Sequence, residues 1–275
     1  MVVNILEMLG AAFILVLGFK SLLWVVYYFQ KNAGIVDIGW AFSFILVSWV
    51  YFFLGEGATS KLMVMTAMVT IWAGRLTWYL FQRYLSMSEE DPRYQEIRKN
   101  WGSENSDFKF YMMFIFQGVL VVILSLPFLI VSADATRVWY PVEFLGILVW
   151  FGGVVGEAFA DKQLLEFKCN PENQGKVCKE GLWKYSRHPN YFFEFVIWLG
   201  FFLFALGSPG GWVSIISLGL ILLLLFKVSG IPQAEAQALK TRGALYEEYQ
   251  METSSFFPWF PRKRKPIPQI EENVK

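Results

Sequence analysis

The single histidine of the chain lies in a polar hexapeptide that precedes an apolar run, Ser186-Arg187-His188-Pro189-Asn190-Tyr191. Arg187 carries a planar guanidinium suited to phosphate, His188 can donate or accept, and Asn190 can do both toward an amide. Pro189 is typical of the first helical turn, where a missing N–H is tolerated. In that helix Asn190 and Glu194 share one face, one turn apart. The pattern predicts a polar ligand site at a helix start.

Two carboxylates upstream extend this candidate site. Glu157 and Asp161 are four residues apart, so they lie on one face of a helix. Like charges at this spacing repel unless donors bind them, and the candidate donors are Lys162, Arg187 or the hydroxyls of a ligand such as a ribose. The nearby glycine-rich run 152–156 has no preceding strand, so it favours close helix packing over a dinucleotide fingerprint.

The elements that must position these residues are apolar helices. Hydrophobic residues make up 55% of the chain and charged residues 17%, with a mean hydropathy of +0.41, unlike a soluble domain. A helix of about 20 apolar residues crosses a bilayer. We expect an all-α integral membrane protein, a bundle of about seven transmembrane helices. The expected spans are Leu6–Phe29, Ile35–Leu54, Leu62–Leu85, Phe110–Val131, Val142–Ala160, Tyr191–Leu206 and Trp212–Ile231.

The distribution of Lys and Arg predicts the orientation. On one side of the bundle the basic residues lie at Lys31 and within 83–109, 162–187 and 240–275. The other side has only Lys61 and Arg137 outside the spans. The positive-inside rule then places the N-terminus outside and the C-terminus in the cytoplasm. We expect residues 1–260 to form a single transmembrane domain with a cytosolic cofactor-binding loop at 161–190, followed by a basic tail at 261–275.

Ionisable residues inside the spans need a partner or a role. Lys20 is expected to extend its ammonium toward the membrane surface. Asp37 and Arg75 either pair across the second and third spans or form the wall of a polar cavity.

Metal and nucleic-acid sites are not indicated. Cys169, Cys178 and His188 have spacings that match no compact zinc site, and a reducing cytosol argues against a disulfide between the two cysteines. The net charge of +1 gives no reason to expect nucleic acid as a partner.

Residues 157–200 resemble the steroid 5α-reductase family of membrane enzymes, and specifically its DUF1295 branch. Four residues match the Arg-His-x-Asn-Tyr pattern of related sterol reductases: Arg187, His188, Asn190 and Tyr191. Glu194 takes the acidic position of the pattern, whereas Phe193 replaces the usual glycine. Weaker resemblance extends to residues 37–40, 74–76, 91–94 and 249–258.

This resemblance implies a membrane reductase that uses NADPH to reduce a carbon–carbon double bond conjugated to a carbonyl in a steroid-like or other lipid. The implied cofactor-binding residues are Glu157, Asp161, Lys168, Arg187, His188 and Asn190. Hydride transfer to the β-carbon develops charge on the carbonyl oxygen, so a donor is needed there. The catalytic candidates are Glu194, if desolvation keeps it protonated, and Tyr191, with Tyr79 and Tyr84 as alternative phenols. The implied substrate pocket contains Asp37, Arg75 and Trp198.

Two alternatives remain. The Arg-His-Pro core is also similar to isoprenylcysteine carboxyl methyltransferases and phospholipid methyltransferases, which bind S-adenosylmethionine. Those enzymes typically carry a paired-Glu element after the last span, and here residues 231–235 supply only Glu235, which favours the reductase. The second alternative is a lipid-binding membrane protein without catalysis.

The expected partners are a hydrophobic substrate and membrane lipids, and no oligomeric state is indicated. The short chain without a retention signal favours a bacterial cytoplasmic membrane, with the active site open to the cytosol.

Overall fold

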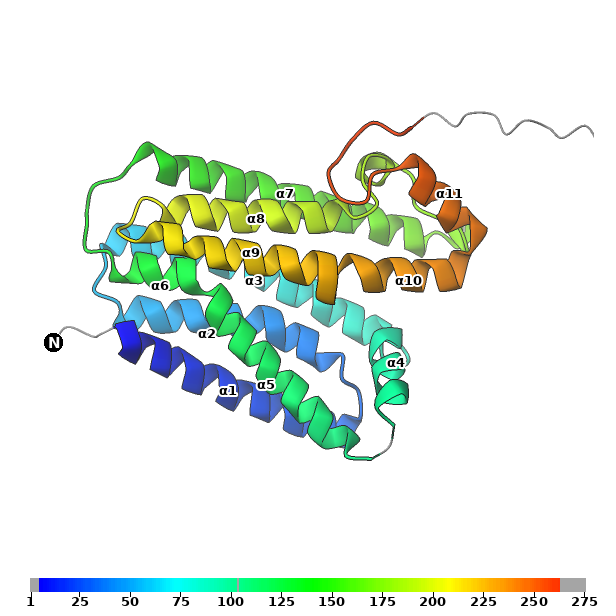
Figure 1. Cartoon of the computed structure of the whole chain (residues 1–275), viewed down its shortest axis with the longest axis horizontal. Helices are drawn as coiled ribbons and strands as arrows, with labels where there is room; N and C mark the ends of the chain where they lie inside the picture. The colour runs from blue at the N-terminus through cyan, green and yellow to red at the C-terminus, as the bar shows by residue number, and fades with distance from the viewer. Residues whose placement is uncertain (1–4, 103, 263–275) are drawn as a thin grey trace, which may run out of the picture. The chain divides into compact units, whose positions relative to one another are not determined.

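The computed structural model describes residues 5–102 and 104–262, and every regular element within them is helical (Figure 1). The all-α prediction is therefore confirmed for this part of the chain. The main helices are α1 (Ile5–Gln30), α2 (Ile35–Leu54), α3 (Thr59–Ser86), α4 (Pro92–Trp101), α5 (Ser106–Leu124), α6 (Leu126–Ala133), α7 (Pro141–Cys169), α8 (Pro189–Ala205), α9 (Ile215–Leu223), α10 (Ile231–Arg242) and α11 (Ala244–Glu252). A π-helical turn at Leu224–Val228 lies between α9 and α10. Most of the expected tail 261–275 lies outside the described residues.

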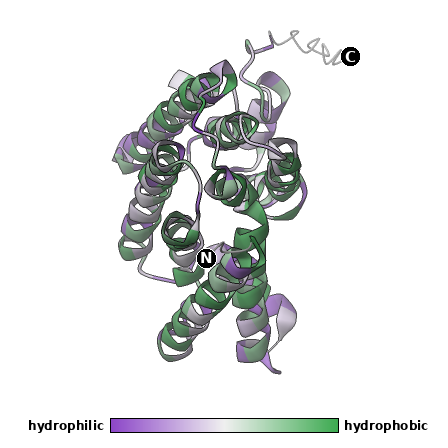
Figure 2. Ribbon diagram, turned by 90° about the vertical axis from the view of Figure 1, so that its left-hand side faces the viewer, coloured by the Kyte–Doolittle hydropathy of each residue, from purple (hydrophilic) through white to green (hydrophobic). Residues whose placement is uncertain are grey.

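Within this described part, five helical stretches are long and apolar enough to cross a membrane. They are α1, α2, α5, α7 and the stretch Gly211–Arg242. Figure 2 shows hydrophobic residues along most of the helices. The protein is therefore a membrane protein.

Two of the seven expected spans correspond to helices with a weaker membrane signal. α8 is apolar but has only 17 residues. α3 is long enough, with 28 residues, but Arg75 and several threonines make it more polar. Both α3 and α8 begin and end within a few residues of the bounds expected for the third and sixth spans.

The fourth expected span, Phe110–Val131, is not one helix. α5 ends at Leu124 and α6 begins at Leu126, with Pro127 in the first turn of α6. A proline inside a helix removes an N–H and clashes with the carbonyl four residues earlier, so the helix breaks before it. At the break the Ser125 hydroxyl donates to the Val122 carbonyl at 2.7 Å.

The expected cytosolic loop at 161–190 also begins later than predicted. α7 continues through Cys169, so the first nine residues of that range are helical. Residues 161–170 contain no glycine or proline that would end the helix, and the Asn170 side chain then accepts the backbone N–H of Glu172 at 3.0 Å. Asp161 and Lys168 are therefore residues of a rigid helix.

The chain forms two compact units, each built from two stretches. The first unit contains the chain up to residue 154 together with 195–223. In it α2 packs against both α1 and α3, and α5 packs against α1 (Figure 1). The second unit contains 155–194 and the chain from residue 224.

Two lysines of the first unit are fully buried. Lys20 donates to the Val36 carbonyl at 3.3 Å and to Gln117 Oε1 at 3.2 Å. The expectation that Lys20 reaches the membrane surface is wrong, because these acceptors satisfy the ammonium inside the bundle.

Lys61, expected in a loop, belongs to the first turn of α3. Its ammonium lies 3.1 Å from Asp134 Oδ2 and 2.8 Å from Glu143 Oε1, and all three side chains are buried. This ion cluster connects α3 with the start of α7. Sequence reasoning missed it because the two acids follow in the chain more than seventy residues later.

Candidate functional site

The polar hexapeptide lies in the second unit. Its last three residues form the start of a helix, as the sequence predicted. α8 begins at Pro189. The turn before it is fixed by Ser186, whose hydroxyl accepts the backbone N–H of His188 at 3.1 Å and donates to the Phe256 carbonyl at 2.8 Å. Both Ser186 and His188 are buried.

A polar stripe on α7 faces this turn. Glu157 and Asp161 are both buried, each with 5% exposure. Asn190 Nδ2 lies 3.5 Å from Asp161 Oδ1, at the long limit of a hydrogen bond. Lys168 is exposed and follows Asp161 by two helical turns, so the three charged residues lie within roughly 40° of one face over about 16 Å of helix. The structure thus brings together predicted site residues from α7 and from the hexapeptide.

The turn at Gly181–Lys184 is attached to the same helix. Leu182 donates its N–H to Gln163 Oε1 at 2.9 Å, and the Trp183 indole donates to the Ala160 carbonyl at 3.0 Å. Gly181 has a φ of +56°, and a Cβ there would lie 2.5 Å from the Gln163 side chain. Only glycine fits this position without strain.

Phe193, the departure from the family pattern, fills a space left by Gly156. A Cβ at Gly156 would lie 2.2 Å from the Phe193 ring. The predicted close packing of α7 is therefore present at Gly156. At Gly152 a Cβ would meet nothing within 4 Å, so the prediction fails at that position.

Arg187 is turned toward protein acceptors. Its Nε and Nη2 lie 2.7 Å and 2.6 Å from Glu235 Oε1, and its Nη1 donates to the carbonyls of Gln250 and Thr253 at 3.0 Å and 2.6 Å. Three of the five N–H donors of the guanidinium are thereby used in hydrogen bonds, and Nη2 forms an ion pair with Glu235. The C-terminal segment thus supplies acceptors for Arg187 that the local sequence does not reveal. The binding of a phosphate by Arg187 stays a prediction.

His188 is held on two sides. Its Nε2 lies 3.2 Å from Glu235 Oε1, and its ring stacks on Tyr191 with the centroids 5.4 Å apart and the planes 8° apart. The second oxygen of Glu235 accepts the Gln250 side-chain amide at 3.0 Å. Tyr191 and Glu194, the predicted catalytic residues, are both half-buried on α8.

The segment from Tyr246 to Trp259, which we call the C-terminal strap, closes over the hexapeptide. Its Ser254 carbonyl accepts the backbone N–H of Arg187 at 2.8 Å, and its Trp259 donates an N–H to the Tyr185 carbonyl at 2.9 Å. The Tyr249 hydroxyl donates to the Trp183 carbonyl.

Two strap tyrosines have raised pKa values. Burial raises the pKa of Tyr246 to about 12, with a further contribution from the negative charge of Glu235. Burial likewise raises the pKa of Tyr249 far above its usual range. Both phenols are neutral at physiological pH.

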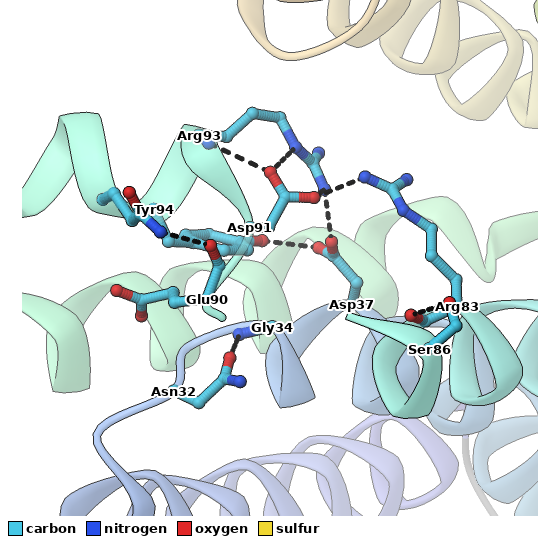
Figure 3. A network of polar contacts seen from close by, with 10 residues as sticks. Asn32, Gly34, Asp37, Arg83, Ser86, Glu90, Asp91, Arg93 and Tyr94 are labelled. Carbon is cyan, nitrogen blue, oxygen red and sulfur yellow. Dashed lines mark hydrogen bonds and ion pairs between the residues drawn. The ribbon is translucent and has the colours of Figure 1, made fainter. Parts of the chain in front are cut away.

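Asp37, in the first unit, binds residues of α4. Its Oδ2 lies 2.8 Å from Arg93 Nη2, and its Oδ1 accepts the Tyr94 hydroxyl at 2.6 Å (Figure 3). The suggested Asp37–Arg75 pair is corrected, because both carboxylate oxygens are bound by α4. Arg75 is half-buried on α3. Two segments of weak resemblance, 37–40 and 91–94, therefore meet here.

Asp91 completes this network. Its carboxylate accepts the backbone N–H and the Nε of Arg93, both at 3.0 Å, and also binds Arg83 (Figure 3). Burial acts to raise the pKa of Asp91. The hydrogen bond and charge of Arg93, together with the charge of Arg83, outweigh burial, so the pKa lies below its ordinary value.

A small cavity of about 20 Å³ lies beside this network. Its lining includes Asn32, Asp37, Arg83, Tyr84, Glu89 and Asp91. One water molecule needs roughly 10–15 Å³ measured in the same way. Asp37 therefore forms an ion pair with Arg93 and also lines this small cavity.

Trp198 is a core residue of the first unit. It is 1% exposed, and its ring contacts Phe44, Trp72 and Phe201 at centroid distances of 5.6, 5.4 and 5.6 Å. The assignment of Trp198 to a substrate pocket is corrected, since its ring is surrounded by other aromatic side chains.

A sequence model of one protein family, described as "Protein of unknown function (DUF1295)", matches residues 23–253. The chain belongs to the DUF1295 family. It is also 26% identical over 271 residues to an uncharacterized protein of Schizosaccharomyces pombe, an alignment that covers 86% of this chain and 76% of the yeast protein. No solved structure matches the chain.

The DUF1295 match includes the hexapeptide, Glu235 and most of the C-terminal strap up to residue 253. Glu235 and Gln250 are the site residues that sequence reasoning missed. The available signal for Glu235 was its place directly after the last apolar span, as the one acid of residues 231–235. Gln250 carried no signal, because its role depends on how α11 packs.

Proposed function

We propose that this DUF1295 protein is a membrane-embedded reductase that uses NADPH to reduce a carbon–carbon double bond conjugated to a carbonyl in a steroid-like or other lipid. The observation that carries the proposal is the contact between Asp161 and Asn190, which joins the charged stripe of α7 to the hexapeptide. Both residues were implied by the resemblance to steroid 5α-reductases.

The residues of the second unit match the groups of a nucleotide cofactor. A carboxylate accepts from ribose hydroxyls, and an amide both donates and accepts, so Asp161 and Asn190 suit a ribose or a carboxamide. Lys168, two turns further along α7, supplies a cation for phosphate. The buried Glu157 lies on the same stripe. NADPH itself would supply the hydride.

The protein must then stabilise charge on the carbonyl oxygen of the substrate. Tyr191, the last residue of the hexapeptide, and Glu194, one turn further along α8, are the proposed donors. A phenol or a protonated carboxyl can donate a hydrogen bond to this oxygen and then transfer a proton to the product.

We further propose that α3 and α8 also cross the membrane, which gives seven crossings with the broken α5–α6 pair counted once. The basic segments then place the C-terminus and the nucleotide site in the cytosol and the N-terminus outside. A bacterial cytoplasmic membrane fits this arrangement.

A methyltransferase that binds S-adenosylmethionine is the second candidate function. The observation in its favour is that Glu235, at the place of the paired-Glu element, binds both Arg187 and His188. Asp161 would suit the ribose of S-adenosylmethionine equally well. The two candidate functions therefore differ in which cofactor the protein binds.

Thermal unfolding of the detergent-purified protein separates these functions. A ligand that binds only the folded state at 100 times its Kd stabilises it by about 2.7 kcal/mol. We expect NADPH to raise the melting temperature and S-adenosylmethionine to leave it unchanged. The Asp161→Asn and Asn190→Ala variants should lose this response, whereas Lys162→Ala, an exposed neighbour on α7, should keep it. Stabilisation by S-adenosylmethionine alone would establish the methyltransferase, and no response to either would favour a non-catalytic lipid-binding protein.

A further inference from the structure

Glu235 is the centre of the hydrogen-bond network beneath the hexapeptide. Its Oε1 accepts a hydrogen bond from Arg187 Nε at 2.7 Å and lies 2.6 Å from Arg187 Nη2 and 3.2 Å from His188 Nε2. Its Oε2 accepts from Gln250 Nε2 at 3.0 Å. The side chains of Arg187, His188 and Glu235 are 10%, 7% and 18% exposed, so the contacts are shielded from water.

The charges of Arg187 and Glu235 determine which ring nitrogen of His188 carries a proton. Arg187 supplies the positive charge that Glu235 requires, so the pair is neutral without a contribution from the histidine. An ionised carboxylate only accepts hydrogen bonds, so the contact at Nε2 requires a proton on that nitrogen. In a neutral imidazole the proton on Nε2 leaves Nδ1 as an acceptor.

The orientation of the ring is fixed as well. Tyr191 stacks flat on one face of the imidazole, and Ser186 holds the backbone N–H of His188. Within the described residues, Nδ1 has no hydrogen-bond partner, while Nε2 is bound to Glu235.

We propose that Glu235 is a positioning residue that holds His188 in the Nε2–H tautomer and presents Nδ1 as a hydrogen-bond acceptor to the bound ligand. An acceptor nitrogen selects a donor, such as a ribose hydroxyl or a carboxamide N–H, and does not pair with a phosphate oxygen. The choice of ligand group rests on the proposed function, whereas the tautomer does not. In histidines bound to metals, a hydrogen bond at the nitrogen that does not bind the metal sets the tautomer and the ring orientation. The contact between His188 Nε2 and Glu235 has the same effect here.

Histidine-selective ¹⁵N labelling tests this directly, because the chain has one histidine and its ring gives a single set of resonances. At alkaline pH the wild-type ring should show one protonated nitrogen, Nε2, whose proton exchanges slowly with water. A ring protonated on Nδ1, or one that remains doubly protonated, would overturn the proposal. This measurement needs no variant, so a folding defect cannot obscure it.

Variants separate positioning from a general structural role. Glu235→Gln keeps an acceptor oxygen, so the slowly exchanging Nε2 proton should persist although the charge partner of Arg187 is lost. Glu235→Leu should abolish that resonance. Glu252→Gln, a carboxylate of the same unit that pairs with Lys179 at 3.3 Å, should have no effect. An unchanged Nε2 proton in a folded Glu235→Leu protein would show that Glu235 does not hold the ring.

Addition of NADPH then reports on the second nitrogen. We expect the Nδ1 resonance to shift when NADPH binds and to stay unchanged with inorganic phosphate. If S-adenosylmethionine shifts Nδ1 and NADPH does not, the tautomer inference stands and the reductase proposal fails. A nucleotide that stabilises the protein thermally without moving Nδ1 would overturn the ligand contact alone.

Discussion

Nη2 of Arg93 lies 2.8 Å from Oδ2 of Asp37, so the first turn of α2 is bonded to the first turn of α4 (Figure 3). The same guanidinium also binds Asp91. Because hydrogen bonds to charged groups contribute about 1.5–3 kcal/mol, we expect Arg93→Gln to lower the free energy of unfolding by an amount in this range. Thermal melting in detergent measures the loss.

A double-mutant cycle identifies the partner. Asp37→Asn combined with Arg93→Gln should destabilise less than the sum of the single variants. Lys162→Ala removes an exposed pair with Glu166 and should have little effect. Strict additivity of the Asp37 and Arg93 variants would contradict a direct energetic link.

The lowered pKa of Asp91 predicts an acid-labile contact. In the folded protein the pKa of Asp91 lies below its ordinary value of 3.8, so this group stabilises the fold above about pH 4. That stability is lost as the pH falls through the folded-state pKa. Asp91→Asn retains an N-cap acceptor for α4 but cannot titrate. Its melting temperature should therefore depend less on pH below about 4 than that of the wild type. Parallel curves for the two proteins would exclude a contribution from Asp91.

Gly156 and Gly152, one helical turn apart on α7, form a matched pair. Gly156→Ala would place a Cβ against the Phe193 ring and should destabilise by about 1–3 kcal/mol through overpacking. Gly152→Ala meets nothing within 4 Å and should be neutral or stabilising by up to about 1 kcal/mol. Phe193→Ala should rescue Gly156→Ala in the double variant. The melting temperatures of the wild type, the two glycine variants and the double variant test this prediction. Equal effects of Gly156→Ala and Gly152→Ala would contradict the packing of Phe193 against Gly156.

Loss of Arg187 should release the C-terminal strap. Arg187→Ala removes the bonds to the Gln250 and Thr253 carbonyls, so we expect faster amide hydrogen exchange in residues 246–256. Arg187→Lys should rescue only partly, because an ammonium lacks the guanidinium fork. Lys184→Ala, at an exposed neighbouring position, is the control. If exchange in the strap stays at the wild-type rate, the contacts of Arg187 are not what orders it.

Local patterns predicted the helices and the start of α8 well, because each depends on neighbouring residues. Pro189 marked the helix start, and apolar runs marked the spans. Pro127 also carried a signal for the break between α5 and α6, but the apolar run across it concealed the interruption.

The partners of the site residues were not predictable in the same way. Arg187 and Glu235 are 48 positions apart, and no periodicity connects them. Likewise, Asp37 has its partners on a short amphipathic helix, which is too polar to resemble an apolar span. Charge pairing across distant segments depends on the tertiary arrangement, which single-sequence patterns do not encode.

The C-terminal strap also has a consequence for biosynthesis. Carbonyls of Gln250, Thr253, Ser254 and Phe256 hold residues 186 and 187, which the ribosome delivers some sixty residues earlier. When the last long apolar helix has entered the membrane, the hexapeptide of the nascent chain therefore still lacks its hydrogen bonds to the strap. The hexapeptide can reach its final structure only after translation has passed the strap, so membrane insertion and completion of the hexapeptide are separate events in time.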